Sequence, residues 1–94
     1  MKYIPAPLAS GRVSLNADML ALAELLARNT HEVWAKERLR QKWRFGPKRD
    51  DDKKEHPRLV PYEMLPEAEK KVDRQVARET IKAILALGYR IVKK

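Results

Sequence analysis

Residues 43–66 read WRFGPKRDDDKKEHPRLVPYEMLP, and this stretch decides the fold because no long helix can continue through it. Gly46 and Pro47 end any helix that approaches from the N-terminal side, since glycine breaks a helix and proline cannot extend one. The charge run KRDDDKKEH follows, and then Pro57 and Pro61 before residue 65. We therefore expect residues 44–65 to form a long, proline-rich, charged loop between two helices.

The segment upstream of this loop, residues 16–43, contains no helix breaker. Asn16 is suited to an N-cap, and Asp18 in the first turn interacts favourably with the helix dipole. At 100° per residue, one apolar stripe covers an arc of about 60°. It consists of Met19, Leu22, Leu26 and Val33. The stripe predicts an amphipathic helix whose core face carries these residues.

The segment downstream of the loop, residues 66–87, predicts a second amphipathic helix. Pro66 suits the first turn, and Gly88 stands where a left-handed C-terminal cap belongs. The apolar stripe of this helix consists of Val72, Val76, Thr80, Ala83 and Leu87. We expect the two stripes to pack against each other.

The two ends of the chain are predicted to be extended. Prolines in residues 1–14 favour an irregular arm, and residues 89–92 alternate enough to predict a short strand. The 94 residues suffice for one domain. The predicted fold is mainly α: two long amphipathic helices packed as an antiparallel hairpin, with short extended or β segments at the ends. Because two helices make a thin core, the arms or a second copy must cover it.

The charge balance is strongly basic, with 21 Lys and Arg against 13 Asp and Glu, a net charge of +8. Residues 36–49 hold seven of these cations and a single acid. Nucleic-acid binding is nevertheless the weaker expectation, because the cations fall on different helix flanks and no recognised nucleic-acid-binding motif is present. The chain lacks cysteine and any apolar run of about 20 residues, so we expect a cytoplasmic protein without a membrane segment.

The sequence NTHEVWA at residues 29–35 resembles the start of an HExxH zinc motif, but Ala35 replaces the second histidine. Catalytic zinc needs three protein ligands, and the chain has only two histidines. The chain has no Cys, and Ser10 and Ser14 lie in a Pro/Gly-rich arm with no base close to them in sequence. We therefore expect no metal site, no cofactor and no enzymatic activity.

Aromatic and basic side chains gather on one helical face near the same stretch. His31, Trp34 and Arg38 lie within about 60° of one another on the helical wheel. An indole beside a guanidinium suits an aromatic ring and its phosphate, through stacking and charge-assisted hydrogen bonds. Trp43 lies on another flank and is a further candidate for ligand binding. The alternative interpretation is that both tryptophans are core-edge residues and the cations serve solubility.

Asp73 is the acid that falls among apolar positions of the second helix. A carboxylate there needs a partner, and Arg49 or Arg58 from the loop is the expected one. We predict that this pair is structural and holds the loop onto the helix.

Several short strings together resemble the ryanodine receptor repeat, or RyR domain. They are HExW at residues 31–34, W-x-F-G-x-x-R-D at 43–50, HPxLVPY at 56–62 and ETxKxILALGY at 79–89. The resemblance extends over most of the chain. It implies a helical hairpin with short strands from a cytosolic regulatory domain, in which repeats pair around a pseudo-two-fold axis.

The resemblance also implies a function. A cleft between paired repeats is associated with adenine-nucleotide binding, which points by position to Trp34, with Arg49 and Arg58 as phosphate contacts. A single copy supplies half of such a pair, so a homodimer is expected. The leading hypothesis is a non-catalytic regulatory or binding module for a small phosphate-containing ligand. The alternative is a protein–protein interaction or structural module without a ligand.

Overall fold

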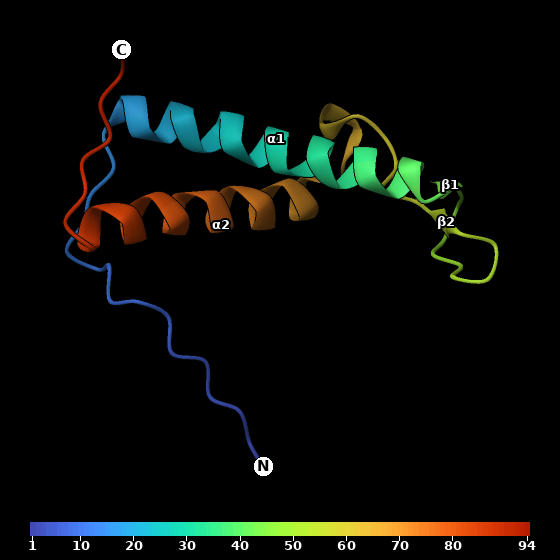
Figure 1. The fold of residues 1–94 in the computed structure, drawn as a ribbon, viewed down its shortest axis with the longest axis horizontal. Coiled ribbons are helices and arrows are strands. Elements are labelled where there is room, and N and C mark those ends of the chain that lie inside the picture. Colours follow the sequence, from blue (N-terminus) through green and yellow to red (C-terminus); the bar gives the residue numbers. More distant parts are fainter.

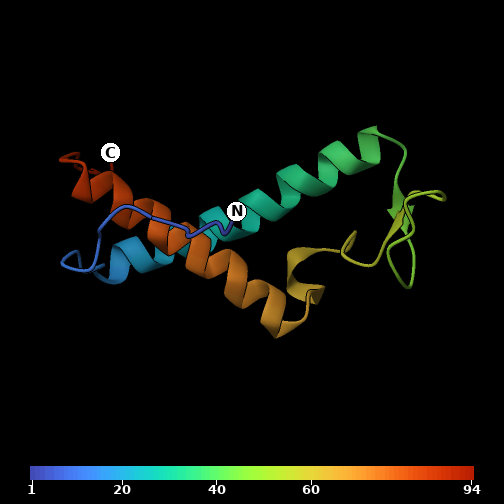
Figure 2. The same cartoon turned by 90° about the horizontal axis from the view of Figure 1, so that it is seen from below.

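The computed structural model describes residues 1–94, and it is mainly helical, as predicted. Helices α1 (Ala17–Arg40) and α2 (Glu67–Ala86) pack against each other. Strands β1 (Arg44–Phe45) and β2 (Glu55–His56) and the 3-10 helix η1 (Tyr62–Met64) lie between them in sequence. The chain runs in opposite directions along the two helices (Figure 1), which cross and then separate toward the loop end (Figure 2). Neither helix has the length and apolar composition needed to cross a membrane.

Two helix ends lie where the sequence places them. The side chain of Asn16 caps α1 by accepting a hydrogen bond from the backbone N–H of Met19 at 2.9 Å. At the other end of the chain Gly88 follows α2 with φ at +96°, in the left-handed region that glycine adopts without strain. Helix α2 itself differs from the expected range 66–87 by one residue at each end.

The C-terminus of α1 corrects the sequence analysis, because the helix stops at Arg40 and not at residue 43. Lys42 adopts the left-handed conformation with φ at +71°, and the N–H of Trp43 donates to the carbonyl oxygen of Arg38 at 3.0 Å. This is the 6→1 bond of a Schellman cap, here closed without glycine. The cap turns the chain before Gly46 is reached.

The loop is more ordered than its composition suggests. Strands β1 and β2 pair in parallel, with Arg44 opposite Glu55. Inside this pair the backbones of Asp50 and Glu55 exchange two hydrogen bonds of 2.9 Å, which closes the acidic run into a tight turn. Gly46 is needed here, because a Cβ at this position would stand 2.5 Å from the Cβ of Glu55. The turn allows a parallel pair without the long crossover that such pairing usually requires.

The predicted strand at residues 89–92 is wrong. These residues form no backbone pairing with another segment, and Ile91 instead packs its side chain against the core. Residues 1–9 are irregular, as expected, and lead away from the helices, so they offer no neighbouring strand (Figure 1). Because no strand lies beside them, residues 89–92 form no sheet, and the apolar Ile91 in this segment packs against the core.

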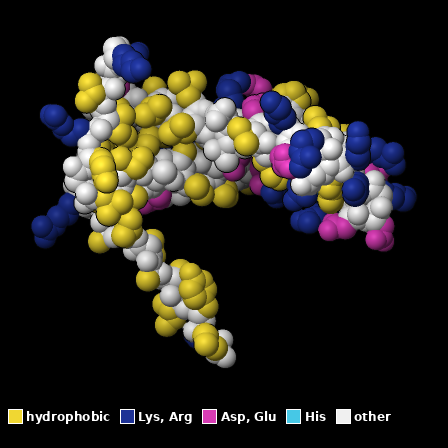
Figure 3. All heavy atoms as spheres, viewed as in Figure 1, with side chains coloured by type: hydrophobic (Ala, Val, Ile, Leu, Met, Phe, Trp, Pro, Cys, Tyr) yellow, Lys and Arg dark blue, Asp and Glu magenta, His cyan; other side chains and the backbone are white.

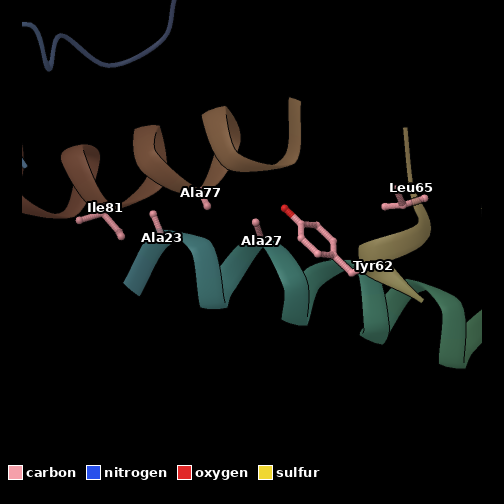
Figure 4. Close-up of a cluster of buried hydrophobic side chains, with 6 residues drawn as sticks. All are labelled: Ala23, Ala27, Tyr62, Leu65, Ala77 and Ile81. Atoms are coloured by element: carbon pink, nitrogen blue, oxygen red, sulfur yellow. The ribbon is translucent and has the colours of Figure 1, made fainter. Parts of the chain in front are cut away.

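The core lies between the helices and is closed at the loop end by η1 (Figure 4). It consists of Ala23, Ala27, Tyr62, Leu65, Ala77 and Ile81. Three alanines let the two helices approach closely. Arg74 adds an ion pair with Glu24 at 2.6 Å across the interface, and this contact lowers the pKa of the Glu24 carboxyl. Only nine of 94 residues are buried, so the core is thin.

The apolar stripes predicted from the sequence lie only partly against the core, where Met19 and Leu22 of α1 pack. Leu26 and Val33 on α1, and Val72 and Val76 on α2, are exposed. On each helix the alanine-lined contact face is rotated by about 120° from the predicted stripe. The interface is made of small residues, which allow closer packing but contribute little to an apolar pattern. The larger side chains therefore form a second face beside the interface.

The molecule has much more surface than a compact chain of its size. Its accessible area is 7924 Å², against about 5600 Å² for a compact monomer. Its radius of gyration is 16.3 Å, against about 12 Å. Hydrophobic side chains gather over one end and along the N-terminal arm, while Lys and Arg crowd the loop end (Figure 3).

Candidate functional site

A cavity of about 330 Å³ opens where the second half of α1 meets the loop and the start of α2. Its walls come from four segments of the chain. They are formed by Thr30, His31, Trp34, Arg38, Arg49, His56, Arg58, Leu65, Glu69 and Asp73. We call this cavity the cleft. Five of the six residues proposed from the sequence line it, and Trp43 does not.

His31 is the buried polar residue of the cleft, and it has a structural role. Its Nε2 lies 2.7 Å from the backbone carbonyl oxygen of Val60. Because a carbonyl oxygen only accepts, this nitrogen carries the proton and donates it. The bond fixes the loop against α1, so His31 shapes the cleft by holding one wall in place.

Trp34 supplies the aromatic surface of the cleft. Its indole is half-buried and meets the imidazole of His56 in a T-shaped contact, with 5.0 Å between the ring centroids. The ring of His31 lies 5.7 Å away on another side. The indole is therefore held between two imidazoles that belong to different segments.

Arg38 joins the two tryptophans. Its guanidinium carbon lies 5.9 Å from the centroid of Trp34 and 5.0 Å from that of Trp43, within the range of cation–π attraction. Trp43 is buried behind it and does not reach the cleft. Arg38 forms no ion pair with a carboxylate, and its side chain donates only to the Gln41 amide at 3.4 Å. Its charge is available to a ligand.

The two loop arginines are paired, but not as the sequence analysis expected. Arg58 binds Glu69 at 2.6 Å, and Arg49 binds Asp51 at 2.8 Å. The predicted ion pair of Asp73 with either arginine is absent. Glu69 lies one helical turn before Asp73 and takes Arg58 in its place. Asp73 instead lines the cleft as a half-buried carboxylate.

His56 is a cleft residue whose protonation the structure defines. Its Nδ1 accepts a hydrogen bond from the backbone N–H of Arg58 at 3.1 Å, so the proton of the neutral ring lies on Nε2. Burial lowers the pKa of His56, and the charges of Arg58, Arg49 and Arg38 lower it further. At neutral pH this imidazole is uncharged and retains one N–H donor.

The match to a known family covers almost the whole chain. The family model of the RyR domain matches residues 3–93. The chain belongs to the RyR domain family. The resemblance noted from short sequence strings is thereby confirmed. Since every residue of the cleft falls inside the matched range, the cleft is built entirely from the RyR domain.

The sequence analysis of this RyR domain missed half of the cleft. Thr30, His56, Leu65, Glu69 and Asp73 line it without having been proposed as ligand-binding residues. They join it because of the path of the loop and the crossing of the helices, which no local spacing encodes. His56 stood within one of the family strings, but nothing in its neighbours indicated a place beside Trp34. No group of three or more His, Cys, Asp or Glu side chains is arranged to hold a metal ion.

Proposed function

We propose that this RyR domain is a non-catalytic binding module whose cleft takes a small phosphate-containing ligand, with an adenine nucleotide as the leading candidate. One observation carries the proposal. Arg38, Arg49 and Arg58, from separate parts of the sequence, line one cavity together with the half-buried indole of Trp34. Guanidinium groups are the preferred partners of phosphate, and an indole is the preferred surface for a base.

Arg38 is the first candidate for the phosphate contact. It has no carboxylate partner, whereas Arg49 and Arg58 are held by Asp51 and Glu69. A phosphate that approached the paired arginines would have to compete with those carboxylates. Two charge-assisted hydrogen bonds from a planar guanidinium give both affinity and orientation. Arg49 and Arg58 then contribute mainly through their charge.

Trp34 and His56 are the candidates for the base. Stacking of a base on an aromatic side chain contributes about 1–3 kcal/mol. The uncharged His56 ring adds an N–H donor, which suits a ring nitrogen acceptor of adenine. A neutral imidazole also leaves the positive charge of the cleft concentrated on its arginines.

Glu69 and Asp73 bring carboxylates into the same cleft. Carboxylates accept hydrogen bonds from hydroxyl and amino groups, and they repel a long polyphosphate. The cavity of about 330 Å³ is at the lower end of the range for small-ligand sites. Both features favour a nucleoside monophosphate over a triphosphate.

Isothermal titration calorimetry with AMP, ATP, adenosine and inorganic phosphate tests this proposal. Saturable binding of AMP, weaker for ATP and for adenosine, is the expected result. Arg38→Ala should weaken AMP binding by roughly 10- to 100-fold, the loss of a charged hydrogen bond. Arg40→Ala is the matched control, because Arg40 stands on the same helix end, pairs with Glu37 and lies outside the cleft.

Absence of binding to any of these compounds by the folded protein would overturn the ligand proposal. A short oligonucleotide at two salt concentrations separates it from nucleic-acid binding through residues 36–49. Counterion release makes such binding fall steeply as salt rises. Equal effects of Arg38→Ala and Arg40→Ala would also indicate diffuse attraction and count against a defined cleft.

A further inference from the structure

An exposed, largely apolar surface runs along one side of the helix pair and borders the cleft at Thr30 and Asp73. It joins one residue of α1 to four of α2, and we call it the apolar flank. It consists of Leu26, Val72, Val76, Thr80 and Ala83. Val72 and Val76 are each 60% exposed, a large fraction for valines on a helix that packs against another. A contiguous set of exposed apolar side chains on a soluble domain is typical of a contact site.

The chain's own arm borders only one end of this flank. Pro7 and Leu8 of the arm line an open hollow together with Val76, Thr80 and Ala83. The other end keeps a hollow of about 220 Å³ between the two helices. Its walls are formed by the apolar Leu26, Val76 and Ala77 and by the polar Thr30, Asp73 and Thr80. This hollow is large enough for a big apolar side chain, and no residue of the chain fills it.

The N-terminal arm carries large apolar side chains of the kind that could fill this hollow. Tyr3 and Ile4 are 80% and 75% exposed and touch no other segment. A hydrogen bond of 3.1 Å from Ser10 to Glu79 holds the base of the arm, and from there the arm leads away from its own helices (Figure 1). It therefore presents its apolar side chains to another molecule.

The prolines of the arm favour binding in an extended form. Pro5 and Pro7 restrict the backbone to polyproline geometry before binding, so less entropy is lost on docking. They also remove two N–H donors that an apolar surface would leave unsatisfied. Recognition of short proline-containing segments by apolar grooves relies on both effects.

Area and charge identify the occupant as a second copy of this chain. The chain exposes about 2300 Å² more than a compact monomer, and a stable interface needs about 800 Å² from each partner. In Figure 3 the Lys and Arg side chains are densest at the loop end, with a few at the other end of the molecule. Lys2 and Asp73, at the arm and at the edge of the hollow, both lack an ion-pair partner within the chain.

We propose that the chain forms a two-fold dimer by exchanging arms. Residues 2–6 of each copy lie on the apolar flank of the other, with Tyr3 or Ile4 in the hollow, while Pro7 and Leu8 stay beside the flank of their own chain. The surface that receives the arm continues from the surface that Pro7 and Leu8 border. The interface is self-complementary, as a two-fold dimer requires.

Sedimentation equilibrium of the full chain tests the exchange. Wild type should be dimeric, and Ile4→Asp in the arm or Leu26→Asp in the hollow should each weaken the dimer by on the order of 100-fold, because a carboxylate must then be desolvated. Leu39→Asp is the matched control, since Leu39 is an exposed leucine of α1 away from the flank, 58% exposed. Circular dichroism checks the fold, and Leu26→Lys replaces Leu26→Asp if the latter unfolds.

Mixing the two variants identifies arm exchange specifically. An intact arm from the Leu26→Asp chain can dock on the intact flank of the Ile4→Asp chain, so a heterodimer with one of two contacts should form. Packing of flank against flank predicts no such rescue. A monomeric wild type at roughly 1 mM, where even weak pairing would be visible, overturns the proposal. Dimers that survive both substitutions also overturn it, and neither result bears on ligand binding in the cleft.

Discussion

The imidazole Nε2 of His31 lies 2.7 Å from the carbonyl oxygen of Val60, and this bond ties α1 to a loop residue 29 positions away. Val60 also packs against the core, and the Arg58–Glu69 ion pair holds the same part of the loop to α2. The hydrogen bond of His31 is the contact that joins this wall of the cleft to α1 through the backbone of Val60. His31, which in the sequence resembles the first histidine of a zinc motif, therefore has a structural role as a hydrogen-bond donor to the loop.

Replacement of His31 by alanine should lower the free energy of unfolding by about 1–3 kcal/mol, the cost of leaving a partly buried carbonyl without its donor. Urea unfolding followed by circular dichroism measures the change. Thr30→Ala, at the exposed neighbouring position, should change stability by less than about 0.5 kcal/mol. Equal midpoints for the two variants would show that the bond contributes nothing.

Tyr62 should tolerate loss of its hydroxyl but not of its ring. The hydroxyl oxygen is buried and has no hydrogen-bond partner, while the ring fills the core under Arg28 and Lys70. We expect Tyr62→Phe to change the unfolding free energy by less than about 1 kcal/mol, and Tyr62→Ala to lower it by about 3–5 kcal/mol. Thermal unfolding of both variants compares them. A large loss in Tyr62→Phe would contradict this account of the core.

The stability of the protein should fall as the pH drops below 6.5, and His56 is the reason. Its pKa in the folded state is lowered by burial and by three arginines, so the unfolded chain binds more protons than the folded one in this range. The stability that neutral His56 provides is complete above its unfolded pKa of about 6.5 and is lost as pH falls through its lower folded pKa. This loss of stability can be measured as a shift of the urea midpoint between pH 7.5 and pH 5, a range in which most carboxylates do not yet titrate.

Comparison with a variant assigns this pH dependence to one residue. His56→Gln should flatten the profile between those pH values, since it removes the titrating group. His31→Gln serves as the comparison at the other histidine. If the urea midpoint of the His56→Gln variant depended on pH as strongly as that of the wild type, another titrating group would be responsible for the pH dependence.

Gly46 should be irreplaceable, in contrast to Gly11. A Cβ at position 46 would meet the Cβ of Glu55 at 2.5 Å, so Gly46→Ala must push β2 away from β1. We expect a loss of about 1–3 kcal/mol and weaker ligand binding, because β2 carries His56. Gly11→Ala has open space around it and should be nearly neutral. Calorimetric unfolding and AMP titration of the two variants, measured together, provide the check.

The sequence predicted the helices well and their contact face badly, for a physical reason. Caps and breakers such as Asn16 and Gly88 act locally, so the helix limits were close, apart from the early turn at Lys42. The contact face is decided by how closely two helices can approach. Ala23 and Ala77 lie in the contact although alanine is only weakly hydrophobic, because its small side chain lets the helices approach. The larger Val76 stays exposed beside the contact.

The cleft was predictable where it depended on one helix. His31, Trp34 and Arg38 recur at helical spacing, so their shared face followed from the sequence. The family resemblance added Arg49 and Arg58. Their partners followed from neither source, because ion pairing across the loop depends on the path that the β1–β2 pairing imposes. Asp73 illustrates this limit. Its position on α2 was predicted correctly, but Arg58, one of its two expected partners, pairs with Glu69.

Both tryptophans of the chain flank Arg38 at the loop end, whereas the alanine-rich contact between the helices contains none. Indole emission therefore monitors only one end of the molecule, whereas far-ultraviolet dichroism monitors both helices along their whole length. Because the core between the two ends is thin, they can unfold at different denaturant concentrations. A denaturation curve recorded by emission alone would then report the opening of the cleft as if the whole domain had unfolded.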